Sequence, residues 1–187
     1  MKKIILIAAA ALAGLAASAQ PKFAHVNFQE IVQLMPEMDS ARTTMELVQN
    51  ETQEIYTSMM QEFQTKYQQF EQKQASWTPA VRESKQRELG EIQNRLQEFE
   101  QSAQQDLQAK QQELMAPIYQ KAQGAVNDIA KKQGFIYVFD ASQILYIDPA
   151  QSTDITKDAR TALGIPEGRT IETLQAELQA KAATQQQ

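Results

Sequence analysis

A long helical stretch, from Glu37 to about Gln133, constrains this chain more than any other feature. Proline and glycine are scarce in it, and the one clear break lies at Ser76-Trp77-Thr78-Pro79. On both sides of the break, apolar residues recur at steps of three and four, which favours amphipathic helix over strand. Two helices with one short connection predict an antiparallel hairpin, with arms of about 55–60 Å and roughly 80 Å.

The apolar stripe of each predicted helix is narrow, with about one apolar residue per turn, as in a coiled coil. Thr52 and Gln111 interrupt the two stripes with polar side chains. So little apolar surface predicts arms that bend. The stripe residues are Met38, Ala41, Met45, Val48, Ile55, Met59, Phe63, Tyr67 and Phe70 before the break, and Leu89, Ile92, Leu96, Phe99, Ala103, Leu107, Leu114, Ile118, Ala122, Ala125 and Ile129 after it.

The first 19 residues have the pattern of a signal peptide. Lys2 and Lys3 precede an apolar run from Ile4 to Leu15, and Ala17-Ser18-Ala19 follows as an A-x-A cleavage site. We expect cleavage between Ala19 and Gln20 and export to the periplasm. An uncleaved anchor is the alternative, although the run is short for a membrane span. The segment holds two lysines and no acid, so cleavage changes the formal net charge from −5 to −7.

Composition argues against several classes of function. The chain has no cysteine, so it forms no disulfide and no cysteine-ligated metal site. Its acidic balance, without a basic patch, is untypical of a nucleic-acid binder. The single histidine, His25, has no evident catalytic or metal-binding partners and is interpreted as a side chain that is merely packed or exposed. No phosphate-binding or nucleophile motif is present, so we expect no enzyme activity, no metal and no cofactor.

The residues that flank the hairpin predict a small β-containing head, made of residues 20–36 and 133–165. Phe23–Phe28 is expected to be a strand, followed by a short helical turn that ends before Pro36. After Gly134, Phe135–Phe139 and Ile144–Ile147 are expected to form two further strands.

A capped helix is expected from Ser152 to Leu163, and a last helix from Thr170 to Ala182. Residues 166–187 therefore form a C-terminal helix with a frayed tail. Three short strands cannot cover the apolar residues of the head, so we expect subunits to join there. The predicted core or subunit contacts are Val26, Phe28, Ile136, Val138, Leu145 and Ile147.

The break in the hairpin has the residues of a tight helix-to-helix turn. Thr78 can cap the second helix, and Pro79 suits its first position, where the missing N–H costs nothing. Trp77 either contacts a partner at the tip or packs back on Phe70 or Val81.

Apolar arm residues are the candidates for contact with a client protein. Met60 lies beside the stripe and is available for a surface contact. The alternative is that the hairpin itself uses several of these residues. The full set is Met60, Phe63, Tyr67, Phe70 and Phe99.

Several stretches together resemble the Skp/OmpH family of periplasmic chaperones. They are Phe23-Ala24-His25-Val26-Asn27 leading to Ile31, the Gln/Glu-rich hairpin, Phe135–Asp140, and Asp154-Ile155-Thr156-Lys157-Asp158. The similarity extends to about Ile165. It implies an α+β, mostly helical fold, in which a long antiparallel coiled-coil hairpin projects from a small β-containing oligomerisation head.

The resemblance further implies a homotrimer whose arms surround a cavity. Unfolded outer-membrane β-barrel proteins would be held there without ATP and kept from aggregating. The chain departs from the family in charge, since residues 37–116 hold 14 acidic and 8 basic side chains. That balance argues against strong binding to anionic lipid. The alternative function is a structural periplasmic adaptor or spacer that docks an envelope complex through its hairpin tip.

Overall fold

The computed structural model describes residues 21–185, so the predicted signal peptide and its Ala19–Gln20 cleavage site lie outside the described residues. The chain divides into two compact units. One unit runs from Met35 to Lys121, and the other combines the residues before Met35 with those from Ala122 onward.

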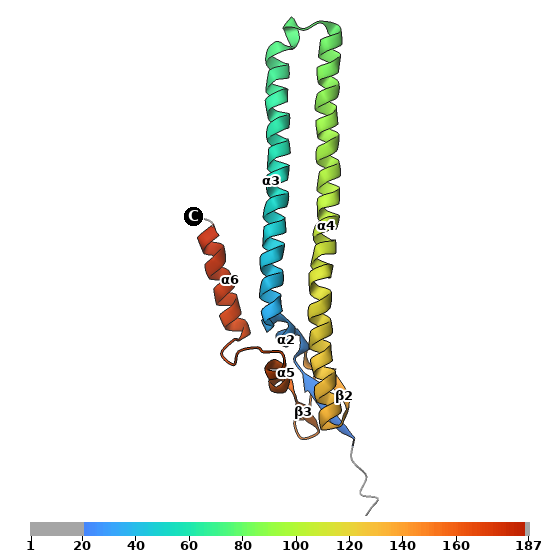
Figure 1. Cartoon of the computed structure of the whole chain (residues 1–187), viewed down its shortest axis with the longest axis vertical. Helices are drawn as coiled ribbons and strands as arrows, with labels where there is room; N and C mark the ends of the chain where they lie inside the picture. The colour runs from blue at the N-terminus through green and yellow to red at the C-terminus, as the bar shows by residue number, and fades with distance from the viewer. Residues whose placement is uncertain (1–20, 186–187) are drawn as a thin grey trace, which may run out of the picture. The chain divides into compact units, whose positions relative to one another are not determined.

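The unit from Met35 to Lys121 is an antiparallel helical hairpin. Helix α3 (Pro36–Lys73) is followed by the 3₁₀ turn η1 (Gln74–Ser76) and by α4 (Pro79–Gln133), whose first part runs back beside α3 (Figure 1). Helix α4 continues through Pro117 without interruption, although proline removes one backbone bond there. The two long helices and their narrow apolar seam confirm the prediction of a coiled-coil-like hairpin.

The seam on α3 differs from the predicted stripe at Tyr67, which is 45% exposed, and at Ile55. That side chain is exposed, and Tyr56 is half-buried in its place. Residues three or four positions apart lie on the same face of a helix, so either Ile55 or Tyr56 could follow Thr52 in the seam. The structure places Tyr56, four residues after Thr52, in the seam. The predictions for Ile55 and Tyr67 were therefore wrong, whereas Ile92, Leu96 and the other predicted stripe residues of α4 are buried or half-buried as expected.

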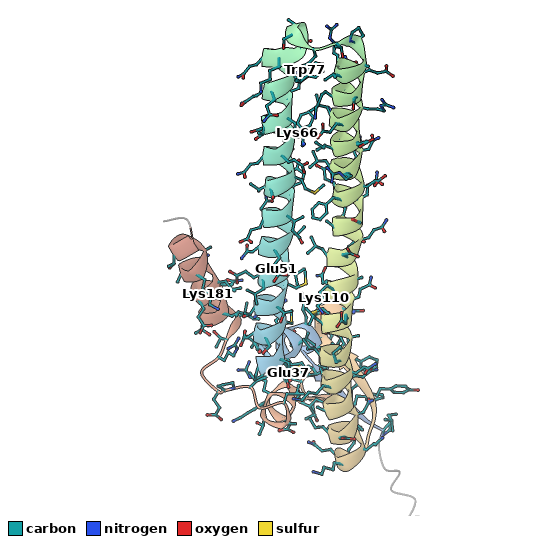
Figure 2. The ribbon with its side chains drawn as sticks, turned by 45° about the horizontal axis from the view of Figure 1, so that its top comes forward. Glu37, Glu51, Lys66, Trp77, Lys110 and Lys181 are labelled. Carbon is teal, nitrogen blue, oxygen red and sulfur yellow. The ribbon has the colours of Figure 1, made fainter. Side chains whose placement is uncertain are left out.

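A polar layer crosses the seam between its middle and the tip. Lys66, which is half-buried on α3, forms an ion pair with Glu88 on α4 (Figure 2). Glu88 also accepts a bond of 2.7 Å from Lys85. These contacts, first the bond from Lys66 and then that from Lys85, lower the pKa of Glu88 from its ordinary value of 4.5 to about 2.

This layer gives the hairpin a defined acid sensitivity. Because the folded pKa of Glu88 lies below the unfolded one, ionised Glu88 stabilises the hairpin above pH 4.5, and the contribution is lost as pH falls toward 2. We expect Glu88→Gln to destabilise the protein by less than about 1 kcal/mol at neutral pH, since surface ion pairs are screened. Urea titrations at several pH values from 6 to 2.5 measure the free energy of unfolding of both proteins. The difference between the variant and the native protein should become smaller as the pH falls. A difference that stays constant would contradict this assignment.

The closed end of the hairpin confirms the predicted turn. Thr78 Oγ1 accepts a bond of 3.4 Å from Val81 N, and α4 begins at Pro79. Trp77 packs edge-on against Phe70, with ring centroids 5.8 Å apart (Figure 2). Of the two interpretations of Trp77, packing against the arm is the one observed.

The other unit is built on a three-stranded parallel sheet with the order β2-β1-β3. Its strands are β1 (Lys22–Val26), β2 (Phe135–Asp140) and β3 (Ser152–Asp154). The short 3₁₀ turn η2 (Ala141–Gln143) follows β2. Its α-helices are α2 (Phe28–Leu34), α5 (Thr156–Ala162), α6 (Ile171–Gln185) and the end of α4.

Two predictions about the segment after β2 were wrong. Residues 144–147 form no strand, and the third strand is Ser152–Asp154, which the sequence had suggested as the start of a helix. A strand requires a partner for its backbone, and β1 offers its free edge to Ser152–Asp154 instead. Asp154 then ends the strand, because its Oδ1 accepts a bond of 2.8 Å from Thr156 N at the start of α5.

Phe28 was also placed incorrectly, since β1 ends at Val26 and Phe28 begins α2. The cause is the side chain of Asn27, which caps the start of α2. Asn27 Oδ1 accepts a bond of 3.1 Å from Glu30 N, and Glu30 Oε2 accepts one of 3.0 Å from Asn27 Nδ2.

One face of this sheet carries the core of the unit. Ala24 and Val26 are buried on it, and they alternate along β1 with Phe23 and His25, which lie on the opposite face. The core is completed by deeply buried residues of the helices and of the segments that flank α5: Ile31, Val32, Leu34, Ala122, Val126, Ile129, Ile155, Ala159, Leu163, Ile165 and Leu174.

The first turns of the C-terminal helix α6 pack against the rest of this unit. Leu174 of α6 is buried, and α6 contacts α2. The Arg160 side chain binds Glu30 Oε1 at 2.8 Å and also donates to the backbone oxygens of Pro166 and Arg169. The connection to α6 is therefore held in place, while the later turns of α6 are exposed.

Candidate functional site

Three aromatic side chains cluster on the face of the sheet that lacks helices of the core. Phe23 lies 6.3 Å from Tyr137 and 6.4 Å from Phe139, and these last two lie 6.0 Å apart, measured between ring centroids. The register explains the cluster, because Phe23 pairs with Tyr137 and alternate residues of a strand share a face. Tyr137 is nevertheless 61% exposed. The cluster is thus an apolar surface that one chain leaves partly uncovered.

The irregular segment after η2 extends this apolar surface. Leu145 is fully exposed and Tyr146 is 78% exposed. Beside them lies an open groove of about 320 Å³, lined by Phe23, His25, Phe139, Ile144, Tyr146, Ile147, Asp148, Gln151 and Ser152. Contiguous apolar exposure of this kind is typical of interaction surfaces. We call Phe23, Tyr137, Phe139, Leu145 and Tyr146 the aromatic face.

The predicted head residues occupy different environments. Val26 is buried in the core of the single chain, whereas Ile136 is 55% exposed and Leu145 is fully exposed. Ile147 is half-buried and lines the groove. Phe28 and Val138 are half-buried, Phe28 on α2 and Val138 on β2. A role of these residues in subunit contact stays a prediction.

The sequence reasoning missed most of the aromatic face. Phe23, Tyr137, Phe139 and Tyr146 were not among the candidates. A signal was present, since Phe135, Tyr137 and Phe139 alternate along one strand and so share one face.

His25 stands at the border of the aromatic face, where it connects two strands. Its Nδ1 lies 2.8 Å from Ser152 Oγ, and its Nε2 lies 3.9 Å from Asp154 Oδ2. Serine, histidine and aspartate are the residue types of a catalytic triad. The distance of 3.9 Å between His25 and Asp154 is, however, too long for the hydrogen bond that would orient the imidazole ring. We interpret the cluster as a tie between β1 and β3, in which His25 is half-buried.

Among residues 21–185, no group of three or more His, Cys, Asp or Glu side chains could hold a metal ion. Within the same range, none of the helices combines the length and the apolar character needed to cross a bilayer.

The proposed client-contact residues lie largely in the seam of the hairpin. Met60, Phe63, Phe70 and Phe99 are half-buried, and only Tyr67 among the five is exposed. Phe63 stacks on Tyr67 with ring centroids 6.0 Å apart. The hairpin therefore uses several of these side chains for its own packing, and client contact by any of them stays a prediction.

Comparison with known proteins places these features in a family. Residues 22–163 match the model of the family described as outer membrane protein (OmpH-like). The protein is 30% identical over 161 residues to the chaperone protein Skp of Yersinia enterocolitica, an alignment that covers 84% of this chain and 96% of that one.

A solved structure shares the fold. The crystal structure of an OmpH-like protein from Caulobacter crescentus CB15 superposes with a TM-score of 0.68 at 16% sequence identity, covering 79% of this chain and 86% of that one. The family match spans β1, the whole hairpin and the strands that follow, and it ends before α6. The chain belongs to the OmpH-like family of outer membrane proteins.

Proposed function

We propose that this protein is an ATP-independent periplasmic holdase, which binds unfolded outer-membrane β-barrel proteins and keeps them from aggregating. The family and the relative named as a chaperone support this function. The observation that carries it is the aromatic face, which a single chain leaves uncovered. Covering that face by joining copies, three of them in this proposal, would bring several hairpins together around a shared space.

The hairpin suits weak and adaptable binding. It has a thin seam, and it exposes isolated apolar side chains such as Leu47 and Ile55 among polar ones. Many contacts, each below about 1 kcal/mol, can sum to useful affinity when they act together on one client. A client enclosed in this way cannot meet the apolar segments of another unfolded chain, which is how aggregation begins.

An aggregation assay tests the proposal. A denatured β-barrel outer-membrane protein is diluted from urea into buffer, and light scattering is followed with increasing amounts of the mature protein. We expect scattering to fall to background near one trimer per client. Undiminished scattering at several-fold excess would exclude the holdase function.

The proposed periplasmic localisation requires export through a signal peptide, which we propose is cleaved. Mass spectrometry of the protein exported from cells should give a mature chain that begins at Gln20. A chain that retains Met1 would contradict cleavage.

A docking function through the hairpin tip is not favoured, because Trp77 packs on Phe70. We expect Trp77→Ala to loosen the tip and lower the free energy of unfolding by about 1 kcal/mol, since a partly buried aromatic pair is lost. Suppression of aggregation should be unchanged. Val81→Ala, another substitution near the tip, serves as the control. Loss of suppression by Trp77→Ala alone would favour the tip as a specific contact.

A further inference from the structure

An open groove lies between α3 and α4 near the middle of the hairpin. It has a volume of about 570 Å³ and is lined by Gln49, Thr52, Gln53, Tyr56, Phe99, Glu100, Ala103, Gln104 and Leu107. The groove exists because small side chains, Thr52 on α3 and Ala103 on α4, occupy stripe positions where larger residues would fill the seam.

The lining of this mid-hairpin groove combines apolar walls with polar groups. Phe99, Leu107 and the ring of Tyr56 provide apolar surface, and three glutamine side chains provide amides that can donate and accept hydrogen bonds. Tyr56 is hydrogen-bonded to Glu100 across the groove, which raises the pKa of Tyr56. An extended polypeptide has groups that match this lining. Its apolar side chains can pack against the apolar walls, and its backbone amides can form hydrogen bonds with the glutamine side chains.

The part of the hairpin that contains the groove carries acidic side chains but no basic ones. The two segments that form it, residues 43–65 and 96–109, contain no lysine or arginine. Basic residues resume on either side, at Arg42 and Lys66 of α3 and at Arg95 and Lys110 of α4; Figure 2 marks Glu51, Lys66 and Lys110. The seven acids of these segments, which we call the acidic belt, are Glu46, Glu51, Glu54, Glu62, Glu98, Glu100 and Asp106.

From the groove and its surrounding charge, we infer that the mid-hairpin groove binds an extended segment of unfolded polypeptide in which apolar side chains alternate with lysine or arginine. An apolar side chain of the segment enters the gap beside Ala103, and a neighbouring basic side chain meets Glu100, the belt residue that lines the groove. Opposite charge favours the encounter and discriminates against acidic segments, where like charges repel. The inference rests on the proposed holdase function and names the segments that this chain prefers.

Two labelled dodecapeptides test the preference directly. Both alternate tyrosine or valine with a charged residue, which is lysine in one peptide and glutamate in the other. Fluorescence anisotropy with the mature protein should show the lysine peptide binding at least about tenfold tighter at roughly 50 mM salt. At about 500 mM salt the ratio should fall below about threefold, because exposed charges are screened.

Two pairs of variants locate the site. Ala103→Leu, which fills the groove, should weaken the lysine peptide at least about fivefold, whereas Ala109→Leu on the exposed side of α4 should change binding less than twofold. Changing Glu100, which lines the groove, and Glu46, which lies one turn before Gln49 on the same face of α3, to Gln should remove most of the preference for lysine. The same change at the exposed residues Glu71 and Glu91, which lie nearer the tip, should preserve it.

The outcomes separate this inference from the holdase function. Equal binding of the two peptides by the native protein, or equal effects of the two glutamate-to-glutamine double variants, would overturn the inference even if aggregation is still suppressed. Failure of the native protein to suppress aggregation would reject the holdase function itself.

Discussion

Replacing Leu145 and Tyr146 with aspartate should separate the protein into single subunits. Both side chains are exposed in one chain and belong to the aromatic face. If that face joins copies, the double variant loses apolar burial and places two charges in the contact. The cost is about 4 kcal/mol or more per contact, which raises the dissociation constant roughly a thousandfold. Light scattering coupled to size-exclusion chromatography at micromolar concentration measures the mass directly.

A matched control for this change lies on the hairpin. Leu47 and Ile55 are likewise exposed apolar residues, and Leu47→Asp with Ile55→Asp adds the same charge. This control should keep the mass of the native assembly. If both double variants keep it, the aromatic face is not the subunit contact. Circular dichroism should show helix content close to native in each, because none of the four residues is buried.

Replacing Ile31 with alanine should give the largest loss of stability. Ile31 lies in α2 and is fully buried in the core of the β-containing unit. Truncating a buried isoleucine typically costs about 2–5 kcal/mol, because apolar contacts are lost and a cavity remains. Urea unfolding measures the loss at a fixed subunit concentration, since the proposed assembly of copies would also stabilise the fold.

Leu178→Ala in α6 is the control for this second change. Leu178 is exposed, so its truncation should cost less than about 0.5 kcal/mol. Equal shifts of the urea midpoint for the two variants would show that the core is not where the structure places it.

The hairpin could be predicted from sequence because its signal repeats over many turns. A period of three to four residues, a proline at the first position of α4 and a capping threonine all indicate the same arrangement. The exchange of Ile55 for Tyr56 could not be predicted, since both continue the pattern after Thr52 and the facing helix decides between them.

The small sheet was harder to predict because its signals are short. Ile144–Ile147 has the composition of a strand, yet backbone pairing is not encoded in composition, and the three residues of β3 are too few to show a period. The error at Phe28 was avoidable, since Asn27 followed three residues later by Glu30 is a capping-box pattern.

The two candidate surfaces differ in what the sequence reveals of them. Alternating aromatic residues in β2 and the absence of basic residues around the groove are both legible in the chain. The groove itself is not, because it depends on Thr52 and Ala103 lining the same gap in a folded hairpin.

Sedimentation equilibrium of the mature protein tests the central claim most directly, namely that copies of this chain join through the aromatic face to form a chamber. At micromolar concentration and neutral pH, the account predicts a species of three times the subunit mass. A species of one subunit mass, with native circular dichroism and a cooperative unfolding transition, would contradict it.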